Sequence, residues 1–165
     1  MIPTPNCNQC SLALTRKNIV SSFGPLPAEV LLVTDSPNRT DEMFNRPLAG
    51  PDAKLFREML TEASGIVRRT IPTLHIVSIT LCRPHESNFD RPPKTSEILN
   101  CMENILHIKD SCSPKLIVLM GDAAKNYYLK EFEDPICLQP CWFIRKHPGY
   151  WINAVSSLAE GLRKC

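Results

Sequence analysis

Four cysteines have the spacing of ligands to one metal centre. Cys7 and Cys10 form a C-x2-C pair near the start, Cys82 lies in the middle of the chain, and Cys101 follows nineteen positions later. Four thiolates suit either a tetrahedral zinc ion or an iron-sulfur cluster. Structural zinc usually pairs two short cysteine knuckles, whereas only the first pair is close here. The spacing therefore favours an iron-sulfur centre, with structural zinc as the alternative.

A simpler interpretation is that these are buried free cysteines, which behave as small hydrophobic side chains. It fits Cys7 and Cys10 poorly, because they lie in an arm with Pro5, Asn6 and Gln9 that offers no core to fill. We expect a cluster to tie this arm to the body of the fold. The other four cysteines carry no comparable pattern and are predicted to be core or surface thiols: Cys112, Cys137, Cys141 and Cys165.

A second group of polar residues follows the first apolar run and begins Thr34-Asp35-Ser36. A carboxylate here could orient or activate a water molecule, although the same residue types also build ordinary turns. Further on, Gly50 precedes a predicted helix that begins near Asp52. A glycine permits close approach of the backbone to a ligand, and a helix N-terminus favours a phosphate.

A third group, Arg145-Lys146-His147, stands beside a proline and two aromatic residues. The imidazole of His147 could donate to an oxygen that gains negative charge, and the two cations could contact phosphates. A lone histidine more often has a structural role, so that interpretation stays open. Tyr150 and Trp151 are predicted to be packing groups.

Short β-branched runs alternate with amphipathic stretches along the chain. We predict strands over residues 29–34, 74–80, 115–120 and 142–146, and helices over residues 52–63, 95–111, 122–130 and 153–163. Strands separated by helices indicate right-handed crossovers and a parallel sheet covered on both faces. The expected fold is α/β, a single three-layer α/β/α domain over residues 1–165 with a four-stranded parallel sheet. Its active crevice should lie beyond the carboxyl ends of the strands.

Composition sets the remaining bounds. The chain has 165 residues and a formal charge of +2, so contact with nucleic acid would need a local basic face. No run of about eighteen apolar residues exists, and the N-terminus lacks the pattern of a signal peptide. We therefore expect a cytoplasmic or nucleoid-associated protein with no membrane partner. In such a reducing compartment, metal ligation is favoured over disulfides.

Together these motifs resemble the iron-sulfur uracil-DNA glycosylases, the family 4 branch of that superfamily. The resemblance runs from Cys7 to about Tyr150. The family's Gly-Glu-Ala-Pro-Gly corresponds to residues 34–38, its Arg-Pro-Phe-x-Gly to residues 46–50, its Pro-Lys-x-Ile-Val-x-x-Gly-x-x-Ala to residues 114–124, and its His-Pro-x-Tyr to residues 147–150. Each motif is weak alone, but their shared order and spacing favour the family and its fold.

The resemblance implies a protein that flips a nucleotide out of DNA and hydrolyses its N-glycosidic bond. It implies catalytic roles for Asp35 and His147, and a 4Fe-4S cluster on the four cysteines named above. Substrate contacts would come from Thr34, Ser36, Leu48 and Ser78, and DNA contacts from Gly50, Arg83, Arg145 and Lys146.

Three positions depart from the family pattern. Leu48 replaces the stacking phenylalanine, Ser78 stands where the base-reading asparagine is expected, and Asp35 replaces a glutamate. These changes leave two main hypotheses: a slow or retuned glycosylase, and an inactive relative that binds DNA or a replication protein. A redox role is a third, more remote possibility, and we expect a monomer.

Overall fold

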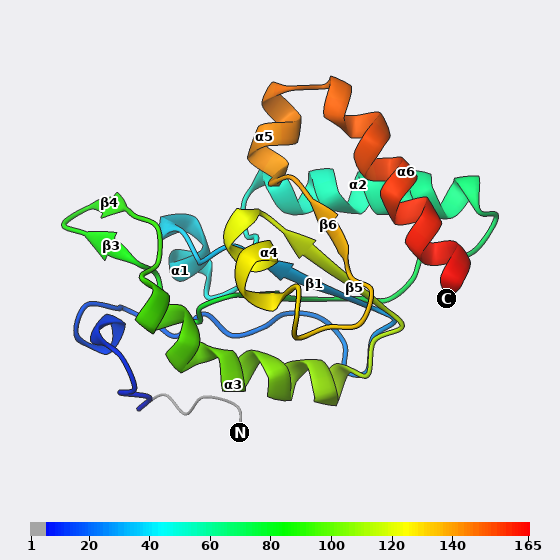
Figure 1. Cartoon of the computed structure of the whole chain (residues 1–165). Helices are drawn as coiled ribbons and strands as arrows, with labels where there is room; N and C mark the ends of the chain where they lie inside the picture. The colour runs from blue at the N-terminus through cyan, green and yellow to red at the C-terminus, as the bar shows by residue number, and fades with distance from the viewer. Residues whose placement is uncertain (1–5) are drawn as a thin grey trace.

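The computed structural model describes residues 6–165 and has an α/β architecture with a central parallel sheet (Figure 1). The sheet order is β2-β1-β5-β6, and every pairing in it is parallel. Its strands are β1 (Val30–Thr34), β2 (Leu74–Ser78), β5 (Leu116–Met120) and β6 (Ile136–Leu138). The predicted fold class and four-stranded parallel sheet are therefore confirmed.

Helices cover both faces of this sheet (Figure 1). Alternate residues of β1 point to opposite faces, so Val30 and Leu32 join one core while Leu31 and Val33 join the other. The first core packs under α2 (Pro51–Ile66), α5 (Cys141–Lys146) and α6 (Gly149–Lys164). The second packs under α3 (Thr95–Cys112) and α4 (Asp122–Tyr128). This arrangement gives the three layers that the sequence predicts.

One predicted strand is wrong. Residues 142–146 form most of the helix α5, and the fourth strand is β6, a short edge strand before it. Cys141 and Ile144 are three positions apart and both buried, which is the spacing of a helix face. Short apolar runs do not distinguish a strand from a buried helical turn. His147 consequently follows a helix and serves as its C-terminal cap residue.

The segment after β2 contains more structure than its proline content indicates. Residues 83–93 contain three prolines, yet they include an antiparallel hairpin of β3 (His85–Glu86) and β4 (Phe89–Asp90). The short helix α1 (Arg39–Phe44) lies beside it, since the Arg39 backbone N–H donates to Asp90 at 3.5 Å. Both features lie beyond the carboxyl end of β1 (Figure 1).

The expected role of Arg83 in facing phosphates is contradicted by its burial. Its side chain is only 5% exposed and is paired with Glu42 of α1 and Asp90 of β4. The Glu42 carboxylate is 3% exposed and also accepts from the backbone N–H of Lys17 at 2.8 Å. Arg83 therefore joins the hairpin, α1 and the N-terminal segment, and it stays inside because its charge is matched there.

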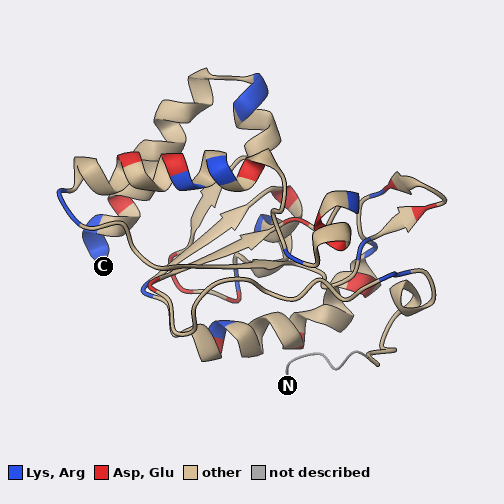
Figure 2. Cartoon of the chain, turned by 180° about the vertical axis from the view of Figure 1, so that it is seen from behind, with Lys and Arg blue, Asp and Glu red and all other residues tan. Residues whose placement is uncertain are grey.

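No helix in the described part of the chain is long and apolar enough to cross a membrane. Charged residues are distributed over several elements, with both signs interspersed along α2 (Figure 2). This distribution agrees with the formal net charge of +2.

We predict that Arg83→Ala lowers the free energy of unfolding by about 3–5 kcal/mol, because it leaves the Glu42 carboxylate buried without its cation. Lys54→Ala is the matched control, since it removes an exposed pair with Glu58 and should cost less than about 0.5 kcal/mol. Urea denaturation of both variants measures the difference. Equal stabilities of the two variants would contradict the structural role of Arg83.

Candidate functional site

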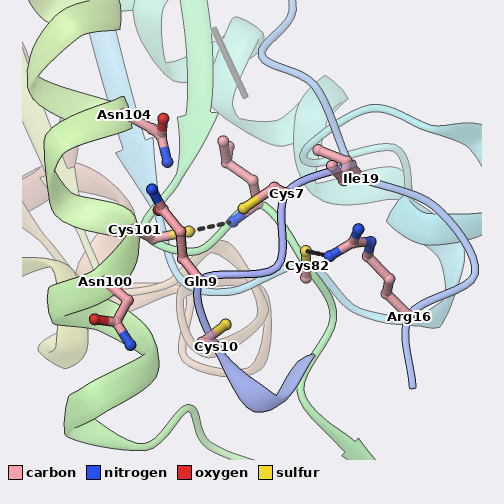
Figure 3. Close-up of a pocket in the computed structure, with 10 residues that line it drawn as sticks. Cys7, Gln9, Cys10, Arg16, Ile19, Cys82, Asn100, Cys101 and Asn104 are labelled. Atoms are coloured by element: carbon pink, nitrogen blue, oxygen red, sulfur yellow. Dashed lines mark hydrogen bonds between the residues drawn. The ribbon is translucent and has the colours of Figure 1, made fainter. Parts of the chain in front are cut away.

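The four predicted metal-ligating cysteines line a single pocket. Cys7 and Cys10 come from the N-terminal segment, Cys82 follows β2, and Cys101 lies on α3. The four sulfur atoms face a common space (Figure 3). The empty space in this pocket, including its opening to solvent, is about 310 Å³. The fold thus brings together residues that are up to 94 positions apart (101 − 7).

Burial keeps two of these thiols protonated at neutral pH when no metal ion is bound. It raises the pKa of Cys82 to about 11 and that of Cys101 to about 12. The Arg16 guanidinium lies 3.9 Å from Cys82 Sγ and offsets part of the effect on Cys82, while the Leu81 backbone N–H donates to Cys101 Sγ at 3.5 Å. Metal binding would convert these thiols to thiolates, so the donor set fits a metal centre. Among the described residues, no group of three or more His, Cys, Asp or Glu side chains is arranged to hold a single metal ion.

Protein contacts hold the cysteine-bearing segment against the fold. Glu97, at the start of α3, accepts from Arg91 at 2.7 and 2.9 Å and from the Lys94 backbone N–H at 2.7 Å. The Ser11 hydroxyl also donates to Glu97, at 3.2 Å. Hydrogen bonds from Arg91 hold the pKa of Glu97 below its usual range, so these contacts persist at neutral pH. They place Cys10, the residue before Ser11, beside α3.

A second pocket opens where the parallel strands end. Its lining includes three of the predicted substrate-contact residues, Thr34, Ser36 and Leu48, together with the predicted catalytic Asp35. The empty space, including its mouth, is about 620 Å³. The remaining lining residues are Asn38, Asp41, Asp52, Met120, Pro140, Cys141 and Trp142. The expected position of the crevice at the carboxyl ends of the strands agrees with this pocket.

Asp35 follows β1 directly and places a carboxyl group in the wall of this second pocket. Burial raises its pKa to about 6, a hydrogen bond from the Ala124 backbone opposes the shift, and the nearby Asp122 charge adds to it. Its Oδ1 atom is buried and has no hydrogen-bond partner in the described structure. A Cβ atom on Gly121 would lie 2.3 Å from Asp35 Oδ2, and Gly121 has a φ of +100°. Glycine at position 121 is therefore required for the carboxylate to lie there.

The loop that carries Leu48 is fixed by the start of α1. The Asn38 side chain accepts from the backbone N–H groups of Thr40 and Asp41, and the Asp41 carboxylate accepts from Asn38 in return. This is a capping box. The other Asp41 oxygen accepts from the Ala49 backbone N–H at 2.7 Å, which ties residues 46–50 to the helix. Leu48 itself has a φ of +54°, an uncommon conformation for a non-glycine residue.

Ser78 does not reach the pocket, although it was expected to read the base. It is only 2% exposed, and its hydroxyl oxygen lies 3.2 Å from that of Thr34 on the neighbouring strand. The parallel register pairs these two residues directly. Ser78 therefore supports Thr34 from within the sheet.

Thr80 is a connecting residue that sequence reasoning missed. Its hydroxyl oxygen lies 2.8 Å from that of Ser36 in the second pocket and 3.0 Å from the carbonyl oxygen of Cys82. Thr80 is fully buried. Its position two residues before a predicted ligand was the signal available in the sequence.

His147 lies outside the lining of the second pocket. Its ring is exposed and packs on Phe143 at a centroid distance of 4.4 Å. Arg145 extends from the same helix and its Nη1 lies 3.0 Å from Asp52 Oδ1, while Lys146 lies over the Trp142 ring. Gly50 is the N-cap residue of α2, and a Cβ added there would meet nothing within 4 Å.

The family model for the uracil DNA glycosylase superfamily matches residues 21–159. This chain belongs to that superfamily. The matched range includes the second pocket and both of the later cysteines, Cys82 and Cys101, whereas Cys7 and Cys10 precede it.

Several curated relatives are each named type-4 uracil-DNA glycosylase. The protein from Saccharolobus solfataricus is 27% identical over 125 residues, covering 76% of this chain and 55% of the relative. That from Archaeoglobus fulgidus is 27% identical over 128 residues, covering 78% and 61%, respectively. That from Sulfurisphaera tokodaii is 30% identical over 122 residues, covering 74% and 53%. The aligned part of this superfamily member thus spans a little over half the length of these relatives.

Asp35 gives a pH-dependent prediction for stability. Its folded pKa of about 6 exceeds the usual 3.8, so ionisation as the pH rises is harder in the folded state, and stability is lost between about pH 4 and 6. Asp35→Asn has no carboxyl group to ionise at this position, so the variant does not lose this stability. The free energy of unfolding of Asp35→Asn minus that of the unmodified protein should therefore increase by up to ~3 kcal/mol between pH 4 and pH 7. Thermal denaturation across this pH range provides the measurement.

The exposed Asp110→Asn is the control and should show no such pH-dependent gain. If the difference in stability between Asp35→Asn and the unmodified protein stays the same across this pH range, the desolvation of Asp35 is contradicted.

Proposed function

We propose that this protein binds DNA and hydrolyses the N-glycosidic bond of a flipped uracil or modified pyrimidine. The observation that carries the proposal is Asp35, a desolvated carboxylate with an unpartnered buried oxygen, lining a pocket at the carboxyl edge of the sheet. Membership of the uracil-DNA glycosylase superfamily and the names of the curated relatives support it.

In this proposal, Asp35 orients a water molecule and accepts its proton. The water oxygen forms a bond to the sugar C1′ while the C1′–N bond breaks, and the bonding electron pair leaves with the base. Thr34 and Ser36 supply hydroxyl groups in the same pocket, and Leu48 supplies an apolar surface. His147 lies outside the lining of this pocket, and we assign it the role of hydrogen-bond donor to the departing base, which gains negative charge, on the superfamily resemblance of residues 147–150.

DNA contact is proposed for the rim formed by Gly50, Arg145 and Lys146. The two cations are exposed near the end of α5, and Gly50 leaves open space at the N-terminus of α2. Backbone N–H groups at a helix start and exposed cations are both suited to phosphate oxygens. Arg83 is left out of this surface because it is buried.

We further propose that Cys7, Cys10, Cys82 and Cys101 hold a 4Fe-4S cluster. Four thiols around one pocket match its donor set, and the presence of only one short C-x2-C pair in the sequence favours the cluster over the zinc alternative. When bound, the cluster would be ligated by these four thiolates, and it would thereby cross-link the N-terminal segment, the segment after β2 and α3. Its proposed role is structural.

Anaerobically purified protein should show a broad visible absorption band from sulfur-to-iron charge transfer. Cys82→Ser should lose most of this band and of the bound iron. Cys165→Ser, which changes an exposed thiol outside the pocket, should retain both. Absorption spectra with iron and zinc analysis make the measurement. Bound zinc without the visible band would replace the cluster with the alternative metal.

A second candidate function is DNA binding without catalysis. It is favoured by the burial of Ser78 beneath Thr34 and by the presence of Leu48, because neither supplies an amide or an aromatic ring to the pocket. This candidate retains the fold and the DNA-facing rim but not base excision.

Excision assays on single- and double-stranded oligonucleotides carrying uracil or a modified pyrimidine separate the two candidates. Under the proposed function, excision rises with pH through about 6 as Asp35 ionises and then levels off. Asp35→Asn should lower the rate by about a hundredfold or more while leaving DNA affinity nearly unchanged. Binding with no excision of any tested base would favour the second candidate.

A further inference from the structure

Trp142 lies in the wall of the second pocket, which Asp35 also lines and which we call the Asp35 pocket, and it exposes an aromatic surface there. Trp142 is the one aromatic residue among the described residues that line this pocket, and it is 49% exposed. Indole has a large apolar surface that is usually covered in a folded protein. A half-exposed indole in a concave site has the chemistry of a contact surface for a planar ligand.

The helix α5 fixes the direction of this side chain. Cys141 and Ile144 are each 2% exposed and anchor one face of α5 in the core, which turns Trp142 away from it. The Phe143 ring meets the indole in a T-shaped contact with centroids 5.8 Å apart. Phe143 in turn packs on Tyr150 with centroids 5.0 Å apart. The indole is therefore held from one side by neighbouring rings.

Charge beside the indole favours a nucleotide over an isolated apolar ligand. Lys146 Nζ lies 5.8 Å from the Trp142 ring centroid. A cation at this distance from the ring can meet a phosphate while the base occupies the pocket. Leu48 lines the same pocket but offers only an aliphatic surface, so a stacking contact there must come from another residue.

We propose that Trp142 is the stacking surface for the planar base that enters this pocket, with Lys146 contacting the adjacent phosphate. This inference rests on the proposed function in taking a nucleobase as the ligand. It makes Trp142 a base-binding residue that the sequence motifs do not identify. The contribution of such a stack corresponds to about a tenfold to hundredfold change in affinity when the ring is removed.

The test uses duplexes that differ at one nucleotide, which is either non-cleavable 2′-fluoro-2′-deoxyuridine or an abasic analogue. The unmodified protein should prefer the base-bearing duplex, and Trp142→Ala should reduce that preference by about tenfold or more. Trp142→Phe keeps an aromatic ring and should retain most of it. Trp151→Phe is the matched control, because the Trp151 indole donates to Glu62 at 2.7 Å and does not line the pocket.

Fluorescence of the Trp151→Phe protein gives an independent readout, since Trp142 is then its only tryptophan. Stacking should quench this emission with the base-bearing duplex and not with the abasic one. Preserved base preference in Trp142→Ala, together with unquenched emission, would overturn the role of Trp142.

Parallel excision assays distinguish this inference from the proposed function. Quenching and a Trp142-dependent preference without excision would support the stacking role while removing the hydrolase activity. Excision that is unaffected by Trp142→Ala, with no quenching, would retain the activity and overturn the inference. Absence of excision, base preference and quenching would overturn both.

Discussion

The fold depends on burying β1 between two parallel neighbours and beneath two layers of helices. Its residues Val30 to Val33 are at most 1% exposed, and its register fixes β2 on one side and β5 on the other. Because all strands run in the same direction, the segments that follow them gather at one edge of the sheet. Both the Asp35 pocket and the cysteine pocket draw residues from this edge. Hydrophobic burial of the strands thus sets the position of the polar chemistry.

Ionic contacts then arrange the segments that the sheet alone does not hold. Arg83 connects α1 with the β3–β4 hairpin, and Glu97 connects the start of α3 with the segment bearing Cys10. Such buried charges are costly to desolvate and persist when each has a partner. Asp35 differs because one of its oxygens lacks a partner in the described structure, and burial raises the pKa of its carboxyl group. A carboxylate with an unpartnered buried oxygen is more easily explained by function than by stability.

The Asp35 pocket agrees with the superfamily pattern at some positions and departs from it at others. Thr34, Asp35 and Ser36 lie where the superfamily resemblance places substrate chemistry, whereas Ser78 is enclosed in the sheet and Leu48 supplies no ring. Trp142 reaches the pocket from α5, a helix in a region where a strand was expected. Thr80, between Ser36 and Cys82, also shows that the two pockets share one hydrogen-bonded boundary.

The fold class, three of the four sheet strands and the four cysteines that meet in one pocket could be predicted from the amino-acid sequence. Alternating apolar runs and helical patterns carry this information because burial imposes a period on each element. Tertiary structure decided what those patterns leave open. Residues 142–146 became a helix because Cys141 and Ile144 share a core-facing side, and Arg83 became internal because Glu42 and Asp90 surround it. Ser78 was enclosed by its partner in the register, and Trp142 was brought to the pocket by α5. Such outcomes depend on contacts between segments distant in sequence, which local spacing does not encode.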